Sequence, residues 1–155
     1  MAQGEKGQQG QKKSGEQEKE QALLLHVPVS PTGEKEPESN FPVVALGASA
    51  GGLEAFQLFF THLPPDTGMA FVLIQHLDPH HKSILSDLLK GYTAMKVAEV
   101  EDGMMLQPDT VFVIPPNRYL AVHYGKLHLL APTHPCGPRM PIDYFFRSLA
   151  ADRKQ

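Results

Sequence analysis

A strand–helix–strand pattern near the middle of the chain most strongly limits what this sequence can fold into. The run Val43–Leu46 favours a β-strand and is followed by a glycine. Residues 53–63 then place apolar side chains at helical spacing, and a proline pair ends that segment. The next run, Ala70–Ile74, is continuously apolar, as expected for a strand covered on both faces. This order predicts a βαβ unit with parallel strands.

The alternation of strands and helices continues to the end of the chain. The further predicted elements are a helix over Ser83–Leu89, strands over Lys96–Val100 and Thr110–Ile114, a β-hairpin of Tyr119–Tyr124 and Lys126–Leu130 around Gly125, and a helix over Ile142–Ala150. We therefore predict an α/β fold that is doubly wound, with a mostly parallel sheet, helices on both faces and a β-hairpin. In such sheets ligands bind beyond the carboxyl ends of the strands.

The first 40 residues differ in composition from the rest. The stretch 1–21 consists almost wholly of Gly, Gln, Lys, Glu and Ser and has no aromatic residue. Such a segment cannot bury enough apolar surface to offset its ordering entropy. We therefore predict that residues 1–40 form a disordered tail or linker and that residues 41–155 form the folded domain. The short apolar patch Leu23–Leu25 leaves a docking peptide as the alternative.

Charge and composition exclude several classes of protein. A net charge of -3 gives no basic footprint for nucleic acid. The longest apolar runs are far shorter than the roughly 18 residues that a membrane-spanning helix needs, so we expect no membrane insertion. The N-terminus has no signal-peptide pattern, and the predicted location is cytoplasmic. The single cysteine, Cys136, rules out an intrachain disulfide and a multi-cysteine zinc site.

The glycine-rich segment Gly47–Gly52 offers a candidate nucleophile. It reads G-A-S-A-G-G, follows the first predicted strand and opens the first predicted helix. The contained G-x-S-x-G pattern places a serine, here Ser49, on a tight turn with its hydroxyl above the sheet. The N-terminus of the following helix can stabilise an oxyanion. A plain glycine-rich turn and an anion-binding turn remain open, although the G-x-G-x-x-G spacing of dinucleotide sites is absent.

His76 is a candidate general base. It follows the apolar strand Ala70–Ile74 after one residue, and so belongs to the same predicted edge as Ser49. A serine hydroxyl needs a base to remove its proton, and imidazole has a suitable pKa. A lone histidine is more often structural, but a nucleophile and a base that share an edge strengthen each other as candidates.

The segment that follows contains Asp78, His80 and His81, which are potential metal ligands. Pro79 interrupts it, and no H-E-x-x-H helix spacing is present. We therefore predict a polar loop, with no metal and no cofactor.

Six segments, taken in chain order, resemble one known family. They are Gly47–Ala55 (GASAGGLEA), Leu63–Pro65 (LPP), Ile74–Leu77 (IQHL), Val97–Gly103 (VAEVEDG), Val113–Asn117 (VIPPN) and Pro141–Ala150 (PIDYFFRSLA). Over residues 42–151 the sequence resembles the catalytic domain of chemotaxis protein-glutamate methylesterases, the CheB-type family. The G-A-S-A-G-G-L-E form is most similar to the esterase segments of CheB–CheR hybrid proteins.

The resemblance implies a doubly wound α/β esterase. Its members hydrolyse γ-glutamyl methyl esters on chemoreceptors, and some deamidate receptor glutamines. Ser49 matches the family's nucleophile and His76 its general base. The backbone around Ala50, with Gly51 and Gly52 in the turn, would contribute to the oxyanion site. The implied partners are methylated chemoreceptors and a fused or separate CheR-type methyltransferase.

The sequence departs from the family pattern in three places. Ala50 stands where the family often has threonine, and residues 1–40 are too few and too polar for a receiver domain. The family's triad aspartate lies in a glycine-rich loop beyond the last predicted helix, a position that neither Asp143 nor Asp152 matches. We therefore expect a domain that is incomplete at its C-terminus, and a chain that is nearly inactive alone. The alternative is a non-catalytic signalling or receptor-docking module on the same fold.

Overall fold

The computed structural model describes residues 40–49, 51–75, 85–132 and 140–153. Its elements follow the predicted order: β1 (Val43–Ala48), α2 (Gly52–Thr61), β2 (Ala70–Gln75), α3 (Leu85–Leu89), β3 (Lys96–Glu99), β4 (Thr110–Val113), β5 (Tyr119–His123), β6 (Lys126–Leu130) and α4 (Pro141–Asp152). The predicted α/β fold is thereby confirmed, with element ends that differ by one or two residues. Residues 1–39 of the predicted tail and Cys136 lie outside the described residues.

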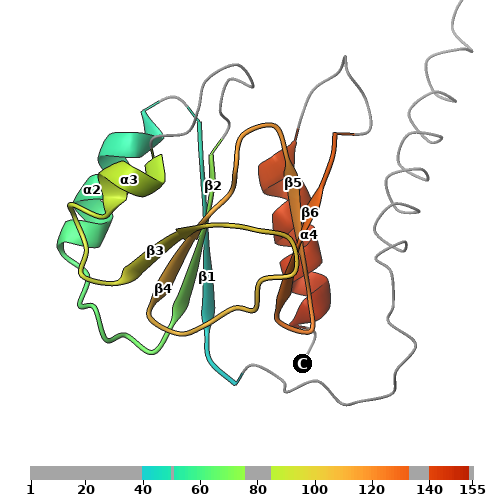
Figure 1. The fold of residues 1–155 in the computed structure, drawn as a ribbon, viewed down its shortest axis with the longest axis horizontal. Helices are drawn as coiled ribbons and strands as arrows, with labels where there is room; N and C mark the ends of the chain where they lie inside the picture. Colours follow the sequence, from blue (N-terminus) through green and yellow to red (C-terminus); the bar gives the residue numbers. More distant parts are fainter. Residues whose placement is uncertain (1–39, 50, 76–84, 133–139, 154–155) are drawn as a thin grey trace, which may run out of the picture. The chain divides into compact units, whose positions relative to one another are not determined.

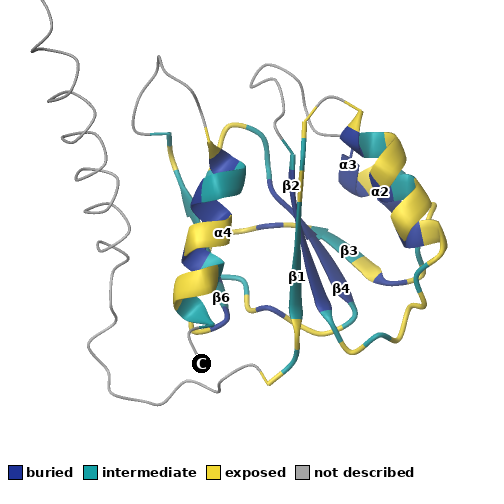
Figure 2. Cartoon of the chain, turned by 180° about the vertical axis from the view of Figure 1, so that it is seen from behind, coloured by how far each residue is buried: buried dark blue, intermediate teal, exposed yellow. Residues whose placement is uncertain are grey.

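The main sheet has four parallel strands in the order β1-β2-β4-β3. Helix α2 connects β1 to its neighbour β2, whereas the chain between β2 and β3 passes over the position of β4. Helices α2 and α3 cover one face of the sheet, and α4 covers the other face together with the β5–β6 hairpin (Figure 1). Strands β2 and β4 are central, and every residue of β4 is buried (Figure 2).

Strand β2 supplies the centre of two separate hydrophobic cores because its side chains alternate between the faces of the sheet. Phe71 and Leu73 point toward α2 and α3, where they join buried residues of both helices. Ala70, Val72 and Ile74 point toward α4 and the hairpin. All five residues are at most 1% exposed, which confirms the strand covered on both faces.

The apolar stripe of α2 determines how this helix lies on the sheet. Phe56 and Phe60 are four residues apart and buried, so they share one helical face. The Phe60 and Phe71 rings meet edge to face, with centroids 5.6 Å apart. Phe59, which also belongs to the predicted stripe, lies at its margin and is 40% exposed.

Helix α4 holds the hairpin against the opposite face. Phe145 is fully buried in the core that contains Val72 and Leu120. Ser148 Oγ accepts a hydrogen bond from the Val122 backbone N–H at 3.2 Å. Because α4 contacts β5 as well as β1 and β2, it fixes the hairpin to the sheet.

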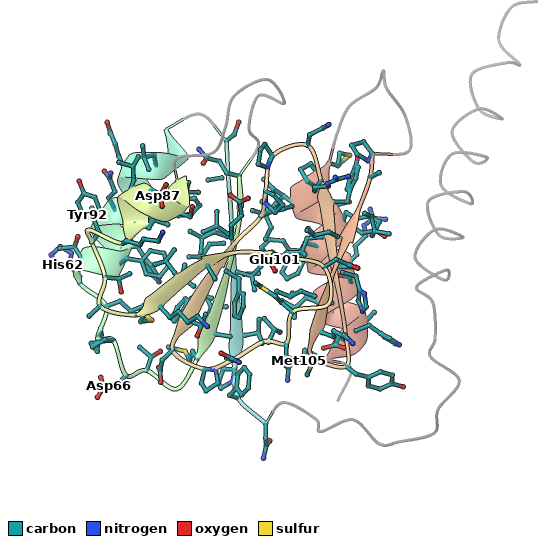
Figure 3. All side chains as sticks on the ribbon, viewed as in Figure 1. His62, Asp66, Asp87, Tyr92, Glu101 and Met105 are labelled. Carbon is teal, nitrogen blue, oxygen red and sulfur yellow. The ribbon has the colours of Figure 1, made fainter. Side chains whose placement is uncertain are left out.

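The hairpin turns at Tyr124 and Gly125, whose φ values of 49° and 72° are both left-handed. Two such residues are typical of a type I′ turn, which favours Asn-Gly over Tyr-Gly. The Tyr124 backbone N–H donates a hydrogen bond to Asp152 Oδ1 at 2.5 Å, which stabilises this conformation. Its ring also contacts that of His123, with centroids 4.3 Å apart. Met105 lies beside the hairpin, bridged to Lys126 in antiparallel fashion (Figure 3).

Asp109 connects the chain segments that lead into two central strands. Its carboxylate Oδ1 accepts hydrogen bonds from the Gly68 N–H at 2.7 Å and the Thr67 hydroxyl at 3.4 Å. Its own N–H donates to the Met69 carbonyl at 2.8 Å. Its φ of 53° is left-handed, a conformation that aspartate tolerates better than most residues.

We expect Asp109→Ala to lower the free energy of unfolding by about 1 kcal/mol, because it removes the acceptor of the Gly68 N–H and strains the left-handed backbone. Asp109→Asn retains an acceptor oxygen and the tolerated conformation, and should stay within about 0.5 kcal/mol of the parent. Urea unfolding at constant m-value measures both variants. An equal loss in the two would show that the carboxylate charge, rather than the hydrogen bonds, stabilises the loop.

None of the helices in the described ranges combines the length and apolar character that a membrane crossing requires.

Candidate functional site

Ser49 lies on the turn between β1 and α2. It is exposed, directly follows the last residue of β1, and its carbonyl accepts the Gly52 N–H at 3.1 Å. Gly51 precedes the helix with φ 82° and ψ −4°, a left-handed conformation in which glycine carries no steric penalty. The predicted strand–turn–helix arrangement around an exposed serine is therefore present.

Two glycines allow neighbouring elements to approach this turn closely. A Cβ at Gly52 would overlap the Ala48 Cβ, so the start of α2 lies directly against the end of β1. A Cβ at Gly47 would lie 2.5 Å from Ile142 Cγ2, in the first turn of α4. The starts of two helices from opposite faces of the sheet therefore enclose the segment that carries Ser49.

The N-terminus of α2 favours negative charge. Backbone N–H groups in the first turn of a helix have no partners within the helix, and the dipole of the helix is positive at that end. No side chain caps this end at Gly51. The Gly52 N–H is already used by the Ser49 carbonyl, so in this conformation Gly52 stabilises the turn. Ala50, the other predicted oxyanion residue, lies outside the described residues.

The end of β2 is the nearest neighbour of the serine turn in the sheet. In the parallel register Ala48 pairs with Gln75, the last residue of each strand. Ser49 and His76 are the next residues in the sequence, but His76 lies outside the described residues, and so do Asp78, His80 and His81. The pairing of Ser49 with His76 therefore stays a prediction, to which the register adds that the strands preceding both residues end side by side, about 4.8 Å apart.

The described histidines lie elsewhere. His62 follows the last residue of α2, at the opposite end of the helix from Ser49, and its Nδ1 lies 2.9 Å from the Leu58 carbonyl oxygen (Figure 3). His123 lies at the hairpin turn, and His128 in β6 lies with its Nδ1 4.0 Å from Asp102 Oδ1. Among the described residues, then, no histidine lies at the serine turn.

The sequence patterns assigned no role to Arg118, which lies in the loop from β4 to β5. The loop from β4 to β5 lies at the same edge of the sheet as the end of β1 (Figure 1). It contains Pro115, Pro116, Asn117 with φ 57°, and the exposed Arg118. The only signal in the sequence is that this loop directly follows the predicted strand Thr110–Ile114.

A pair of tyrosines lies next to this loop. The rings of Tyr119 and Tyr144 meet edge to face, with centroids 5.2 Å apart. The Tyr144 hydroxyl is buried and has no hydrogen-bond partner among the described residues. Burial raises the pKa of Tyr144, and the neighbouring Tyr119 adds to the effect, so the hydroxyl remains protonated at neutral pH.

Within the described ranges, no three His, Cys, Asp or Glu side chains come together in a way that could hold a metal ion.

Three comparisons relate this chain to known proteins. The family model for CheB methylesterase matches residues 44–155. The protein-glutamate methylesterase/protein-glutamine glutaminase of Geobacillus kaustophilus (strain HTA426) is 36% identical over 115 residues, covering 72% of this chain and 33% of that protein. A protein of the same name from Yersinia pestis is 30% identical over 138 residues, covering 86% of this chain and 37% of that protein. This chain therefore spans about a third of the length of these relatives.

The structural comparison agrees with the predicted fold. The crystal structure of the Thermotoga maritima CheB methylesterase catalytic domain matches with a TM-score of 0.64 and 24% identity. The match covers 72% of this chain and 61% of that chain.

Proposed function

Since the chain belongs to the CheB methylesterase family, we propose that it hydrolyses γ-glutamyl methyl esters of proteins, releasing methanol and leaving glutamate. The observation that carries the proposal is the exposed Ser49 on a tight turn between a parallel strand and a helix N-terminus. This arrangement presents a hydroxyl to a substrate and a positive dipole end to the charge that develops during ester hydrolysis.

The proposed reaction has two stages. The Ser49 hydroxyl oxygen attacks the ester carbonyl carbon while His76 takes the hydroxyl proton. The negatively charged tetrahedral oxygen is stabilised at the start of α2. The carbon–methoxy bond then breaks, His76 returns the proton to the leaving oxygen, and methanol departs. Water hydrolyses the glutamyl-serine ester by the same route, which regenerates Ser49.

The same residues can carry a second reaction. Both named relatives are protein-glutamate methylesterases and protein-glutamine glutaminases. An amide differs from the methyl ester only in its leaving group, which would depart as ammonia after receiving the His76 proton. We extend the proposal to the glutamine reaction on this ground.

The proposed substrates are methylated chemoreceptors, and the proposed compartment is the cytoplasm. A CheR-type methyltransferase, fused or separate, would supply the esters that this reaction removes. Neither Asp143 nor Asp152 matches the motif of the family's triad aspartate, so the proposed roles are those of Ser49 and His76.

The test is ester hydrolysis by the full 155-residue chain. A peptide with one γ-glutamyl methyl ester is incubated with excess protein, and its mass and the released methanol are followed. We expect slow conversion to the glutamate peptide, faster than in buffer alone, and slower ammonia release from the matched glutamine peptide. A folded chain that does not exceed the spontaneous rate would contradict the proposal and favour a receptor-docking module.

A further inference from the structure

The loop between β4 and β5 lies across the end of β2 from the serine turn. Val113, the last residue of β4, pairs with Leu73, and the following Ile114 N–H donates to the Leu73 carbonyl at 3.1 Å. β4 and β1 are the two neighbours of β2 in the sheet, so these two strands lie about 10 Å apart at the usual spacing of parallel strands. A substrate segment of ordinary size can therefore contact both the serine turn and this loop.

The loop is conformationally restricted. Pro115 and Pro116 each have a fixed φ, and Asn117 turns the chain in the left-handed region at φ 57°. Tyr119, the first residue of β5, is held by its ring contact with Tyr144, which is 4% exposed. Arg118 stands between these anchors and is exposed. Its guanidinium therefore extends into solvent from a backbone of fixed position.

Arg118 differs from the other described arginines in its charge environment. It forms no ion pair with a residue in the described ranges, whereas Arg147 lies 2.9 Å from Asp143 and Arg153 lies 3.6 Å from Asp152. A guanidinium without a partner among these residues suits a planar carboxylate, which it can bind through two parallel hydrogen bonds. On the other side of the turn, Glu54 is exposed in the first turn of α2 and repels a carboxylate. Of these two described side chains, the one that attracts a carboxylate therefore lies on the side of the β4–β5 loop.

We propose that Arg118 is a specificity-determining residue that binds an acidic side chain of the substrate protein while the glutamyl group lies at Ser49. The inference rests on the proposed function for the identity of the target group. It adds a substrate class: segments in which a second carboxylate accompanies the glutamyl ester or glutamine. The orientation of the segment follows, because the acid must lie toward the β4–β5 loop and away from Glu54.

The experiment measures binding as well as turnover, so that it does not depend on catalysis. Two labelled peptides carry the same target glutamine; one has a second acidic residue, a glutamate, close to it in the sequence, and the other has glutamine at that position. Fluorescence anisotropy with the full chain gives the two Kd values. We expect the parent to bind the acidic peptide up to about fivefold more tightly, as an exposed ion pair allows. Arg118→Gln should reduce this ratio to near one, and Arg118→Glu should invert it.

The matched control is Arg147→Gln, which removes an exposed arginine that is already paired with Asp143. It should leave the ratio of Kd values unchanged, and Arg118→Lys should retain only part of it, because lysine cannot form the two parallel hydrogen bonds. An unchanged ratio in Arg118→Gln, or equal weakening of both peptides, would overturn the proposal.

The same peptides as methyl esters separate this inference from the proposed function. We expect Arg118→Gln to raise KM for the acidic ester alone, with kcat unchanged. A chain that shows the binding preference without hydrolysing either ester would refute the esterase proposal and leave the acid-binding site standing. A chain that hydrolyses both esters with equal kcat/KM would support the esterase proposal and refute the acid-binding role of Arg118.

Discussion

Ser49→Ala is expected to reduce ester hydrolysis by the 155-residue chain by about a hundredfold. In a serine protease, loss of the serine costs about 2 × 10⁶ in kcat, whereas loss of the aspartate costs about 3 × 10⁴. The ratio of the two, roughly a hundredfold, is the rate enhancement that a serine–histidine pair retains without its acid. We expect the stability of the variant to change by less than about 1 kcal/mol, because Ser49 is exposed and its side chain can be shortened without leaving a cavity. Methanol release under single-turnover conditions measures the loss.

Two further variants make this test specific to a pair of groups. His76→Gln should lose as much activity as Ser49→Ala, and the double variant should lose no more than either, since a nucleophile and its base act as a unit. Thr61→Ala is the control and should keep the parent rate, because it removes an exposed hydroxyl at the last residue of α2, the opposite end of the helix from Ser49. Multiplicative losses in the double variant would show that the two residues do not work together.

Gly52→Ala is expected to lower the free energy of unfolding by about 2 kcal/mol and to reduce hydrolysis at the same time. The added methyl group would overlap the Ala48 Cβ, so the start of α2 must move away from the end of β1. The Ser49 turn lies between these two elements and must move with them. Denaturant unfolding and the hydrolysis rate, measured on the same preparation, report the two effects.

A second substitution can restore the contact. Ala48→Gly in the Gly52→Ala chain removes the methyl group that causes the overlap, and we expect it to recover much of the lost stability. Gly91→Ala is the control, because a Cβ there meets only the Leu88 carbonyl oxygen, at 3.4 Å. If Gly91→Ala is as harmful as Gly52→Ala, the cause is the general loss of glycine rather than the approach of α2 to β1.

The sequence alone determined the type and order of the elements, because hydrophobic periodicity is a local property. The spacing of Phe56 and Phe60 gave α2 its buried face, and the continuous apolar run of β2 predicted a strand between two covered faces. Ser49 was also found locally, since a strand, a glycine-rich turn and a helix follow one another directly in the chain.

Some features of the turns and the cores could not be read in this way. The hairpin turn uses Tyr124, a weak turn former, because Asp152 of α4 holds its backbone N–H. Phe59 fits the helical spacing but is 40% exposed, because only the edge of its ring meets Phe71 of β2. In both cases the deciding partner is distant in the sequence, and a periodic pattern carries no information about such partners.

Only the tertiary structure decided which strands are neighbours. No pattern in the sequence indicates that β4 enters the sheet between β2 and β3, because parallel pairing requires no complementary side chains. That order sets the end of β2 beside the serine turn and brings Arg118 to the same edge from nearly 70 residues further along the chain. The proposed nucleophile was therefore visible in the sequence, whereas the surroundings that would select its substrate depend on the order of strands in the sheet.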